Sequence, residues 1–225
     1  MKGRIFELKD VWKVYFMKGV ETNALRGINL AVEKGDYAAI LGPSGCGKST
    51  IMHIMGCLDT PTKGSVLVEG RDISEMNDDE LAKIRREKIG FIFQAYNLIP
   101  SLTAIENVAL PMRFEGRGRG ESMKRASELL LRVGLENRMH HKPNEMSGGE
   151  QQRVAIARAL SNDPDVILAD EPTGNLDTKT GQEIIELLES LHKKTGKTII
   201  IVTHDVRLAD RAHKKIKMLD GKIVN

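Results

Sequence analysis

The sequence is poor in cysteine and has no long hydrophobic run, and each shortage excludes a class of protein. Two cysteines in 225 residues, Cys46 and Cys57, are too few for a disulfide scaffold. They also lack the C-x-x-C spacing of redox and zinc sites, so free thiols that are buried or half-buried are expected. The longest apolar stretches, such as residues 166–169 and 198–202, are only as long as a strand. A membrane-spanning helix needs roughly 20 apolar residues, so we expect no membrane crossing by this chain.

A strong net charge is also lacking. The chain holds 34 Lys and Arg against 31 Asp and Glu, a formal net charge of +3, and these charges are spread along its length. Nucleic-acid binding is typical of concentrated basic patches or tails, so no nucleic-acid partner is expected. Charges interrupt residues 1–13, which therefore lack the apolar centre of a secretion signal, and we expect a cytoplasmic protein.

The hydrophobic pattern divides the chain into predicted strands and helices. Short runs of β-branched or alternating apolar residues predict strands, and apolar residues with a period of 3.6 predict helices. Strands are predicted at residues 4–14, 24–32, 37–41, 64–70, 89–93, 166–169, 198–202 and 216–219. Helices are predicted at residues 48–57, 78–86, 103–113, 121–133, 149–160 and 178–195, with a short helix from residue 206 and a solvated loop at residues 116–120.

The order of these elements predicts the fold class. Strands that alternate with helices predict an α/β fold with a mostly parallel sheet. Residues 95–160 are almost wholly helical and are interpreted as an insertion. We therefore predict a single domain over residues 1–225, with a core at residues 1–94 and 161–225 and an inserted helical subdomain at 95–160.

A glycine-rich motif lies between the predicted strand 37–41 and the helix that follows it. Gly42-Pro43-Ser44-Gly45-Cys46-Gly47-Lys48-Ser49 matches the G-x-x-x-x-G-K-[ST] phosphate loop. The glycines allow backbone N–H groups to turn toward a polyphosphate, and the helix adds its positive dipole end. We expect Lys48 to reach the β- and γ-phosphates, Ser49 to bind Mg²⁺ and Thr50 to support the α-phosphate.

Two acids follow the apolar strand 166–169. Nucleoside triphosphatases with a phosphate loop need such a pair, one carboxylate for Mg²⁺ and one for the attacking water. Side chains of an extended chain alternate in direction, so Asp170 is expected to face Mg²⁺ and Glu171 the water, as general base. The alternative is a pair of solvated acids at the end of a strand.

A third motif narrows the family. Met146-Ser147-Gly148-Gly149-Glu150 and the helix that follows it resemble the signature of ABC transporter ATP-binding subunits, usually written LSGGQ. Met146 and Glu150 depart from that pattern, while the serine and both glycines keep the part that approaches phosphate. The segments 57–64 and 97–103 resemble the macrolide-exporter and lipoprotein-releasing branch, without identifying the cargo.

The resemblance covers nearly the whole chain and assigns further residues. Tyr15 resembles the aromatic residue that stacks on adenine, and Gln94 resembles the Q-loop glutamine, with catalytic and Mg²⁺-binding roles. Asp177 resembles the D-loop aspartate, and His204, in Thr203-His204-Asp205, the histidine that contacts the γ-phosphate. Each has an ordinary structural alternative, respectively a half-buried aromatic, a polar residue at a strand end, a helix N-cap and a loop histidine.

The resemblance implies a phosphate-loop nucleoside triphosphatase fold of the RecA-like kind, with an N-terminal antiparallel β subdomain. It implies an ATP-binding and hydrolysing subunit of an ABC transporter, with ATP and Mg²⁺ as ligands and Glu171, His204, Lys48 and Gln94 as catalytic residues. Two ATP-bound chains would pair head-to-tail, so that residues 147–150 of one contact the ATP of the other. The dimer would drive a separate integral membrane subunit, docked on the helical subdomain, from the cytoplasmic face of the cell membrane.

Glu150 suggests an additional hypothesis, because an acid near the γ-phosphate would be repelled. Residues 147–150 also form an S-x-x-E capping box, in which Glu150 folds back to the backbone N–H of Ser147. We therefore expect the carboxylate to point away from the nucleotide.

Three alternative functions are weighed against transport. A soluble ABC ATPase acting on DNA would place a long coiled coil between the two motifs, but only about a hundred residues without heptads separate Lys48 from Ser147. A translation-associated ABC protein would carry two cassettes, and this chain has one. A nucleotide-dependent regulator that barely hydrolyses ATP is disfavoured by Glu171 and His204.

Overall fold

The computed structural model describes residues 3–17 and 19–224, which form two compact units. The first unit draws on residues 1–85 and 197–225, and the second on residues 86–196. Helix α2 (Asp78–Lys88) runs from the first unit into the second. The outer boundaries of the predicted domain, residues 1 and 225, lie outside the described residues.

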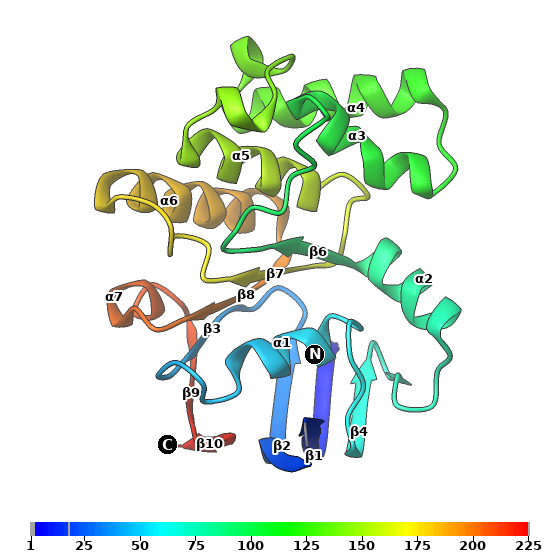
Figure 1. The fold of residues 1–225 in the computed structure, drawn as a ribbon, viewed down its shortest axis with the longest axis vertical. Helices are drawn as coiled ribbons and strands as arrows, with labels where there is room; N and C mark the ends of the chain where they lie inside the picture. Colours follow the sequence, from blue (N-terminus) through cyan, green and yellow to red (C-terminus); the bar gives the residue numbers. More distant parts are fainter. Residues whose placement is uncertain (1–2, 18, 225) are drawn as a thin grey trace. The chain divides into compact units, whose positions relative to one another are not determined.

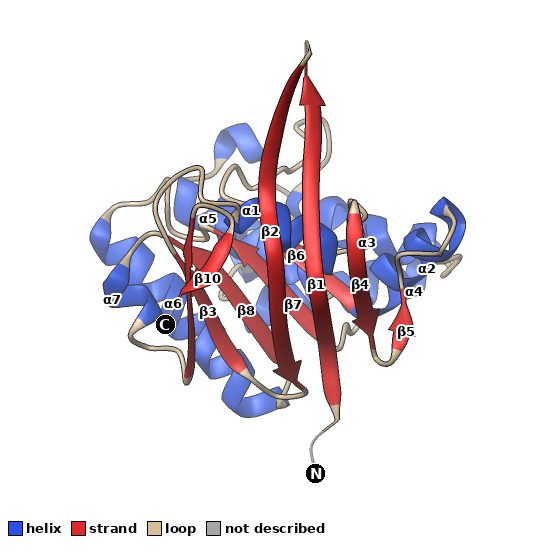
Figure 2. Ribbon diagram, turned by 90° about the horizontal axis from the view of Figure 1, so that it is seen from below, coloured by secondary structure: helices blue, strands red, loops and turns tan. Residues whose placement is uncertain are grey.

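An antiparallel sheet forms the N-terminal part of the first unit. Its strand order is β2-β1-β4-β5, and Figure 2 shows β1 between β2 and β4. The strands are β1 (Arg4–Met17), β2 (Val20–Glu33), β4 (Lys63–Val68) and β5 (Arg71–Asp72). Phe6 pairs with Val32 on one side and Val68 on the other, and it is fully buried at the centre of the sheet. The predicted antiparallel β subdomain is confirmed.

The rest of the first unit is built around three parallel strands. Strand β3 lies between β8 and β9 and is parallel to both, while β10 pairs antiparallel with β9 at the edge. These elements are β3 (Tyr37–Leu41), β8 (Thr198–Thr203), β9 (Lys214–Leu219) and β10 (Lys222–Val224), with helices α1 (Lys48–Met55) and α7 (Val206–Ala209) packed against them. All of β8 is buried, as its continuous apolar run predicts.

The second unit combines two parallel strands with four long helices. Strand β6 (Ile89–Ile92) pairs with β7 (Val166–Asp170). The helices are α3 (Ala104–Phe114), α4 (Arg119–Arg132), α5 (Gly148–Ala159) and α6 (Thr178–Thr195), with short 3₁₀ turns η1 (Glu136–Arg138) and η2 (Pro143–Glu145). Helix α5 packs against α3, α4 and α6 (Figure 1). In the described part of the chain, no helix is both long and apolar enough to cross a membrane.

The differences from the sequence prediction lie mostly in short elements. Strands β5 and β10 are not predicted, because two or three residues are too few to show a period. Residues Arg119 and Gly120, predicted as part of a loop, form the first turn of α4, with Gly118 as N-cap. Thr103, predicted inside a helix, is the N-cap of α3 and forms a capping box with Glu106.

A buried asparagine ties the preceding loop to α3. Asn107 is only 1 % exposed. Its side-chain Oδ1 accepts the N–H of Ile99 at 2.8 Å. Its Nδ2 donates to the carbonyl oxygens of Leu102 and Thr103, at 3.1 and 3.0 Å. One side chain therefore bonds the Ile99 N–H and the Leu102 carbonyl oxygen of the loop. It adds a second hydrogen bond to the Thr103 carbonyl oxygen, which already accepts the N–H of Asn107.

We expect Asn107→Ala to lower the free energy of unfolding by about 2–3 kcal/mol, because it removes a buried side chain that makes several hydrogen bonds to the backbone of the preceding loop. Urea denaturation followed by circular dichroism measures the loss. The exposed Asn137 provides a matched control, and Asn137→Ala should cost less than about 0.5 kcal/mol. Equal losses in the two variants would contradict this role of Asn107.

Candidate functional site

The phosphate-loop motif connects β3 to α1 through a turn that requires glycine. Gly47 is the N-cap of α1, with φ of 100°, and no side chain caps this helix. A Cβ atom at Gly47 would lie 2.5 Å from the carbonyl oxygen of Ala24 in β2. Only glycine fits both the left-handed conformation and this close approach. The N–H groups at the start of α1 are therefore left for a ligand outside the helix.

Lys48 places a buried positive charge beside this turn. Its side chain is 7 % exposed, and Nζ donates to the carbonyl oxygens of Gly42 and Pro43, both at 2.8 Å. The next two residues of α1 are Ser49, which is exposed, and Thr50, which is half-buried. A helix N-terminus, an ammonium group and a hydroxyl thus converge on one loop, which is an arrangement that suits a polyphosphate.

The histidine motif begins at the neighbouring strand end. Leu41 pairs with Thr203 in the parallel ladder of β3 and β8, and the N–H of Gly42 donates to the carbonyl oxygen of Thr203 at 3.4 Å. His204 follows and is exposed. Asp205 then donates its N–H to Thr203 Oγ1 at 3.0 Å and caps α7. The first unit therefore brings the phosphate loop and His204 to adjacent carboxyl ends of parallel strands, where α/β folds bind ligands.

The acidic pair lies at the end of β7 in the second unit. Asp170 is the last residue of the strand, and Glu171 has φ of 44°. Both side chains are half-buried. The predicted alternation of the two side chains assumes an extended backbone, and Glu171 departs from that assumption because its backbone is left-handed. The tight turn after the strand, rather than strand geometry, sets the direction of Glu171.

Gln94, after β6, is joined to the segment after β7. Its Nε2 donates to Asn175 Oδ1 at 3.3 Å, and Asn175 Nδ2 donates to the carbonyl oxygen of Gln94 at 2.9 Å. Gln94 itself is exposed. The segments that resemble the Q-loop and the D-loop are therefore held together within the second unit. Asn175 lies in the segment 174–177 that resembles the D-loop, but nothing in the sequence indicates that it bonds to Gln94.

The loop after Gln94 is also fixed to α5. The guanidinium group of Arg158 donates to the carbonyl oxygens of Tyr96, at 2.7 Å, and Asn97. Both Tyr96 and Asn97 have positive φ, at 59° and 50°. Burial lowers the pKa of Arg158. This contact was not predicted, although an arginine on the otherwise apolar side of a helix signals a buried partner.

The signature segment forms the predicted capping box at the N-terminus of α5. The N–H of Glu150 donates to Ser147 Oγ at 3.3 Å, and the N–H of Ser147 donates to Glu150 Oε2 at 2.8 Å. A Cβ atom at Gly149 would lie 2.4 Å from Cγ2 of Thr180, so glycine is needed where α5 meets the first turn of α6. The hypothesis that Glu150 folds back onto its own helix is confirmed.

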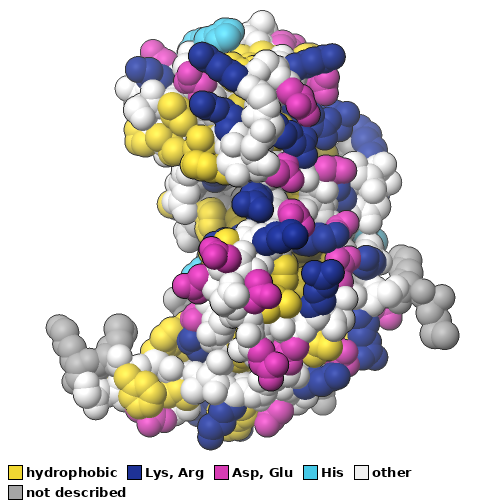
Figure 3. All heavy atoms as spheres, turned by 90° about the vertical axis from the view of Figure 1, so that its right-hand side faces the viewer, with side chains coloured by type: hydrophobic (Ala, Val, Ile, Leu, Met, Phe, Trp, Pro, Cys, Tyr) yellow, Lys and Arg dark blue, Asp and Glu magenta, His cyan; other side chains and the backbone are white. Residues whose placement is uncertain are grey.

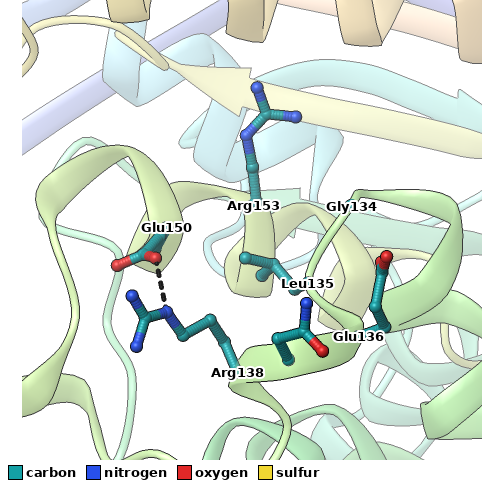
Figure 4. Close-up of a pocket in the computed structure, with 7 residues that line it drawn as sticks. Gly134, Leu135, Glu136, Arg138, Glu150 and Arg153 are labelled. Atoms are coloured by element: carbon teal, nitrogen blue, oxygen red, sulfur yellow. Dashed lines mark hydrogen bonds and ion pairs between the residues drawn. The ribbon is translucent and has the colours of Figure 1, made fainter.

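Arg138 engages the other oxygen of the Glu150 carboxylate. Its Nε donates to Glu150 Oε1 at 2.9 Å, and Figure 4 shows the two side chains joined by this bond where they line a cavity of about 640 Å³. The cavity is also lined by Arg153, whose guanidinium donates to Glu183 at 3.0 Å. The pKa of Glu150 is lowered, mainly by the hydrogen bond from the Ser147 backbone N–H. The Ser147 side chain and the charge of Arg138 lower it further.

Asp177 caps α6, which is the structural alternative considered for it. Its Oδ1 accepts the N–H groups of Lys179 and Thr180, at 3.1 and 3.0 Å. The Thr180 hydroxyl donates to Oδ2 at 2.6 Å, and these bonds lower the pKa of Asp177. Because Thr180 also meets Gly149, the first turns of α5 and α6 lie together.

The described residues also show what kinds of metal and thiol sites the chain has. In the described part of the chain, no group of three or more His, Cys, Asp or Glu side chains could hold a metal ion. Both cysteines are free and buried, as predicted. Cys46 lies inside the phosphate loop, where its carbonyl oxygen accepts the N–H of Gly221 at 3.1 Å.

A phosphate loop between a buried parallel strand and a helix places the chain in the phosphate-loop class of nucleotide-binding proteins. Comparison with known proteins identifies the family. The family described as "ABC transporter" matches residues 25–174. An uncharacterized ABC transporter ATP-binding protein of Thermotoga maritima is 57% identical over 220 residues, covering 98% of this chain and 94% of that protein.

Two further similarities concern an exporter and a solved structure. The macrolide export ATP-binding/permease protein MacB of Hyphomonas neptunium is 50% identical over the whole chain, which covers 35% of that protein. The ABC transporter cassette MJ0796 of Methanocaldococcus jannaschii, solved as a dimer, matches with a TM-score of 0.91 and 50% identity, covering 98% of this chain and 97% of that one. A second structure of MJ0796 is a post-hydrolysis state bound to ADP and phosphate.

The chain therefore belongs to the ABC transporter family and is an ATP-binding ABC ATPase domain. The predicted α/β fold is confirmed, as is the predicted likeness to the ATP-binding part of macrolide exporters.

The lowered pKa of Glu150 predicts how the α5 cap depends on pH. A carboxyl group whose pKa falls on folding stabilises the fold above its unfolded value of about 4.3, and this contribution is lost as the pH falls through the folded pKa. We expect Glu150→Gln to lower the free energy of unfolding near neutral pH by on the order of 0.5 kcal/mol. Urea unfolding at a series of pH values should show this difference shrinking in acid.

Glu136→Gln, in the same cavity, is the matched control and should show a smaller difference from the wild type. A difference for Glu150→Gln that stays constant into acid would rule out an ionised cap.

Proposed function

We propose that the phosphate loop binds the phosphates of ATP and that Glu171, His204 and Gln94 complete the hydrolytic site. The observation that carries this proposal is the uncapped N-terminus of α1 beside the buried ammonium group of Lys48. Residues Gly42 to Thr50 surround the phosphates, and Tyr15 stacks on adenine. Residues 1–94 and 161–225 act as the core, and residues 95–160 as the helical subdomain.

The residues assigned to Mg²⁺ suit that ion. Ser49 offers a hydroxyl, Asp170 a carboxylate and Gln94 an amide oxygen, and oxygen ligands are those that Mg²⁺ prefers. Mg²⁺ usually takes few protein ligands because phosphates and water supply the others, so a three-residue acidic or histidine cluster is not required. When bound, the ion neutralises charge on the phosphates.

Hydrolysis follows from the roles of the side chains. Glu171 takes a proton from water as the water oxygen bonds to the γ-phosphorus, and the bond to the ADP oxygen breaks. Lys48 and His204 stabilise the negative charge that develops on the transferred phosphoryl group. Gln94, held by Asn175, orients the water and the metal ion.

Two chains share each ATP in this proposal. Ser147 is exposed at the N-terminus of α5, whose dipole favours a phosphate. The relative MJ0796 is known as a dimeric structure. ATP on the phosphate loop of one chain is then covered by the partner's Ser147, while Asp177 borders the same contact.

A separate membrane subunit is the proposed partner. MacB of Hyphomonas neptunium is by name both an ATP-binding protein and a permease, and this chain matches 35% of it. Exposed apolar side chains on the second unit, Ile99, Phe114 and Leu131, offer contact area for such a subunit. On the face in Figure 3 hydrophobic side chains reach the surface between interspersed basic and acidic ones. We place the chain peripherally on the cytoplasmic face of the cell membrane.

We expect Glu171→Gln to slow ATP hydrolysis by at least about 100-fold, because the amide cannot accept the proton of water. The variant should retain ATP and elute as a dimer in size-exclusion chromatography with ATP and Mg²⁺. The phosphate release rate and the elution volume are the measurements. Glu186→Gln, on the exposed face of α6, is the control and should leave both unchanged.

Equal hydrolysis by the wild type and Glu171→Gln would remove Glu171 as the base. A Glu171→Gln protein that stays monomeric with ATP would count against the shared site.

The position of Glu150 predicts a second effect on dimerisation. Because Arg138 and the cap engage both carboxylate oxygens, Glu150→Gln should change the dimerisation constant by less than about threefold at low salt. Arg138→Ala should weaken the dimer, and adding Glu150→Gln should restore it. These constants are measured in the Glu171→Gln background with ATP. A sharply tighter dimer for Glu150→Gln alone would show that the carboxylate repels the phosphates.

A further inference from the structure

The segment 57–64 follows α1 and includes the first two residues of β4, and the ATP chemistry above gives it no role. Asp59, within this segment, makes two side-chain contacts with β1. Its Oδ2 accepts the hydroxyl proton of Tyr15 at 2.8 Å, and its Oδ1 pairs with Nζ of Lys13 at 2.5 Å. Both partners lie on the strand that carries the proposed adenine platform. Asp59 is therefore the common anchor of two β1 side chains that are two residues apart.

Lys13 lies over one face of the Tyr15 ring and also contacts the segment 57–64. Its Nζ lies 5.0 Å from the centroid of the Tyr15 ring and also donates to the carbonyl oxygen of Thr60 at 2.7 Å. The Lys13 side chain is 12% exposed, so the ammonium group is largely withdrawn from water. A cation over an aromatic face is attractive and restrains the ring. Because Lys13 covers one face, a base that stacks on Tyr15 must use the other.

The backbone of the same segment braces β1 next to Tyr15. The N–H of Val14 donates to Thr62 Oγ1 at 3.0 Å, and the N–H of Thr62 donates to the carbonyl oxygen of Trp12 at 2.8 Å. The pairing of β1 with β2 shifts register between Lys13 and Val14, so strand pairing alone does not fix this stretch. The segment 57–64 supplies the missing restraint.

Tyr15 is also linked to the phosphate loop through α1. Burial and the Asp59 hydrogen bond raise the pKa of Tyr15 to about 12, while a hydrogen bond with the side chain of Thr50 acts in the opposite direction. Thr50 belongs to the first turn of α1, and Asp59 follows the end of that helix. The phenol is thus held by groups at both ends of the helix that begins at the phosphate loop.

We propose that Asp59 is a positioning residue for nucleotide recognition, which together with Lys13 fixes the Tyr15 ring at the distance from the phosphate loop that an adenine base requires. The proposal rests on the proposed function, in which Tyr15 stacks on the base. Asp59 contributes to the binding of the base and makes no contact with the triphosphate. A ring that is already restrained before the nucleotide binds loses less conformational entropy when the base stacks on it.

Comparing a ligand with a base and one without tests this role. Dissociation constants for ATP and for inorganic tripolyphosphate, both with Mg²⁺, are measured by calorimetry for the wild type, Asp59→Ala, Tyr15→Phe and Tyr15→Ala. Asp59→Ala should raise the dissociation constant for ATP about tenfold, which corresponds to part of the binding free energy that base–aromatic stacking supplies. Tripolyphosphate binding should stay unchanged, because its contacts lie in the phosphate loop.

Two further variants show whether Asp59 acts through the phenol. In the Tyr15→Phe background, Asp59→Ala should have a much smaller effect on ATP binding, since the hydroxyl that Asp59 holds is gone. Asp79→Ala, at an exposed acid of α2, is the matched control and should leave both ligands unaffected. Thermal unfolding of every variant checks that the fold persists.

The outcomes separate this proposal from the proposed function. Equal weakening of ATP and tripolyphosphate by Asp59→Ala would overturn the positioning role, because the phosphate loop itself would then be disturbed. If Tyr15→Ala loses the preference for ATP over tripolyphosphate but Asp59→Ala binds ATP normally, the role of Asp59 is overturned while that of Tyr15 stands. A wild type that binds both ligands equally would remove Tyr15 as an adenine platform, and the role of Asp59 with it.

Discussion

The left-handed turn at Gly47 is the constraint on which the nucleotide site depends. With φ of 100° and the carbonyl oxygen of Ala24 beneath it, this residue starts α1 without any side-chain cap. The next residue, Lys48, can then turn its ammonium group back onto the loop carbonyls of Gly42 and Pro43. Backbone conformation therefore concentrates positive potential at one point, where a helix dipole and a buried charge reinforce each other.

The two helix N-termini that the proposed site uses are built differently. Helix α1 has no cap, whereas α5 is closed by Ser147 and Glu150, whose side chains satisfy each other's backbone N–H groups. The box at α5 leaves the N–H groups of Gly148 and Gly149 outside it. An acid is tolerated there because both of its oxygens are engaged, one by the Ser147 N–H and the other by Arg138. The usual glutamine is thus replaced without a free negative charge at the helix end.

Much of the fold follows from local patterns in the sequence. The bounds of β3 and α6 are predicted without error, because a buried apolar run and a capped amphipathic helix give strong local signals. The fifth and tenth strands escape prediction because their pairing, not their residue pattern, makes them strands. The left-handed backbone of Glu171 is not predicted either, since nothing in the local sequence signals such a residue directly after a buried strand.

The remaining features depend on pairs that lie far apart in the sequence. Motifs identify Tyr15 and Gln94, but no motif indicates which residue holds each of these side chains. Asp59 is 44 positions from Tyr15, and Asn175 is 81 positions from Gln94. No periodicity connects such partners, so only the fold reveals them. The residues that touch ATP in the proposed mechanism are accordingly predictable from sequence, whereas the residues that orient them are not. Variation in nucleotide affinity between otherwise similar cassettes is then expected to arise in this second group.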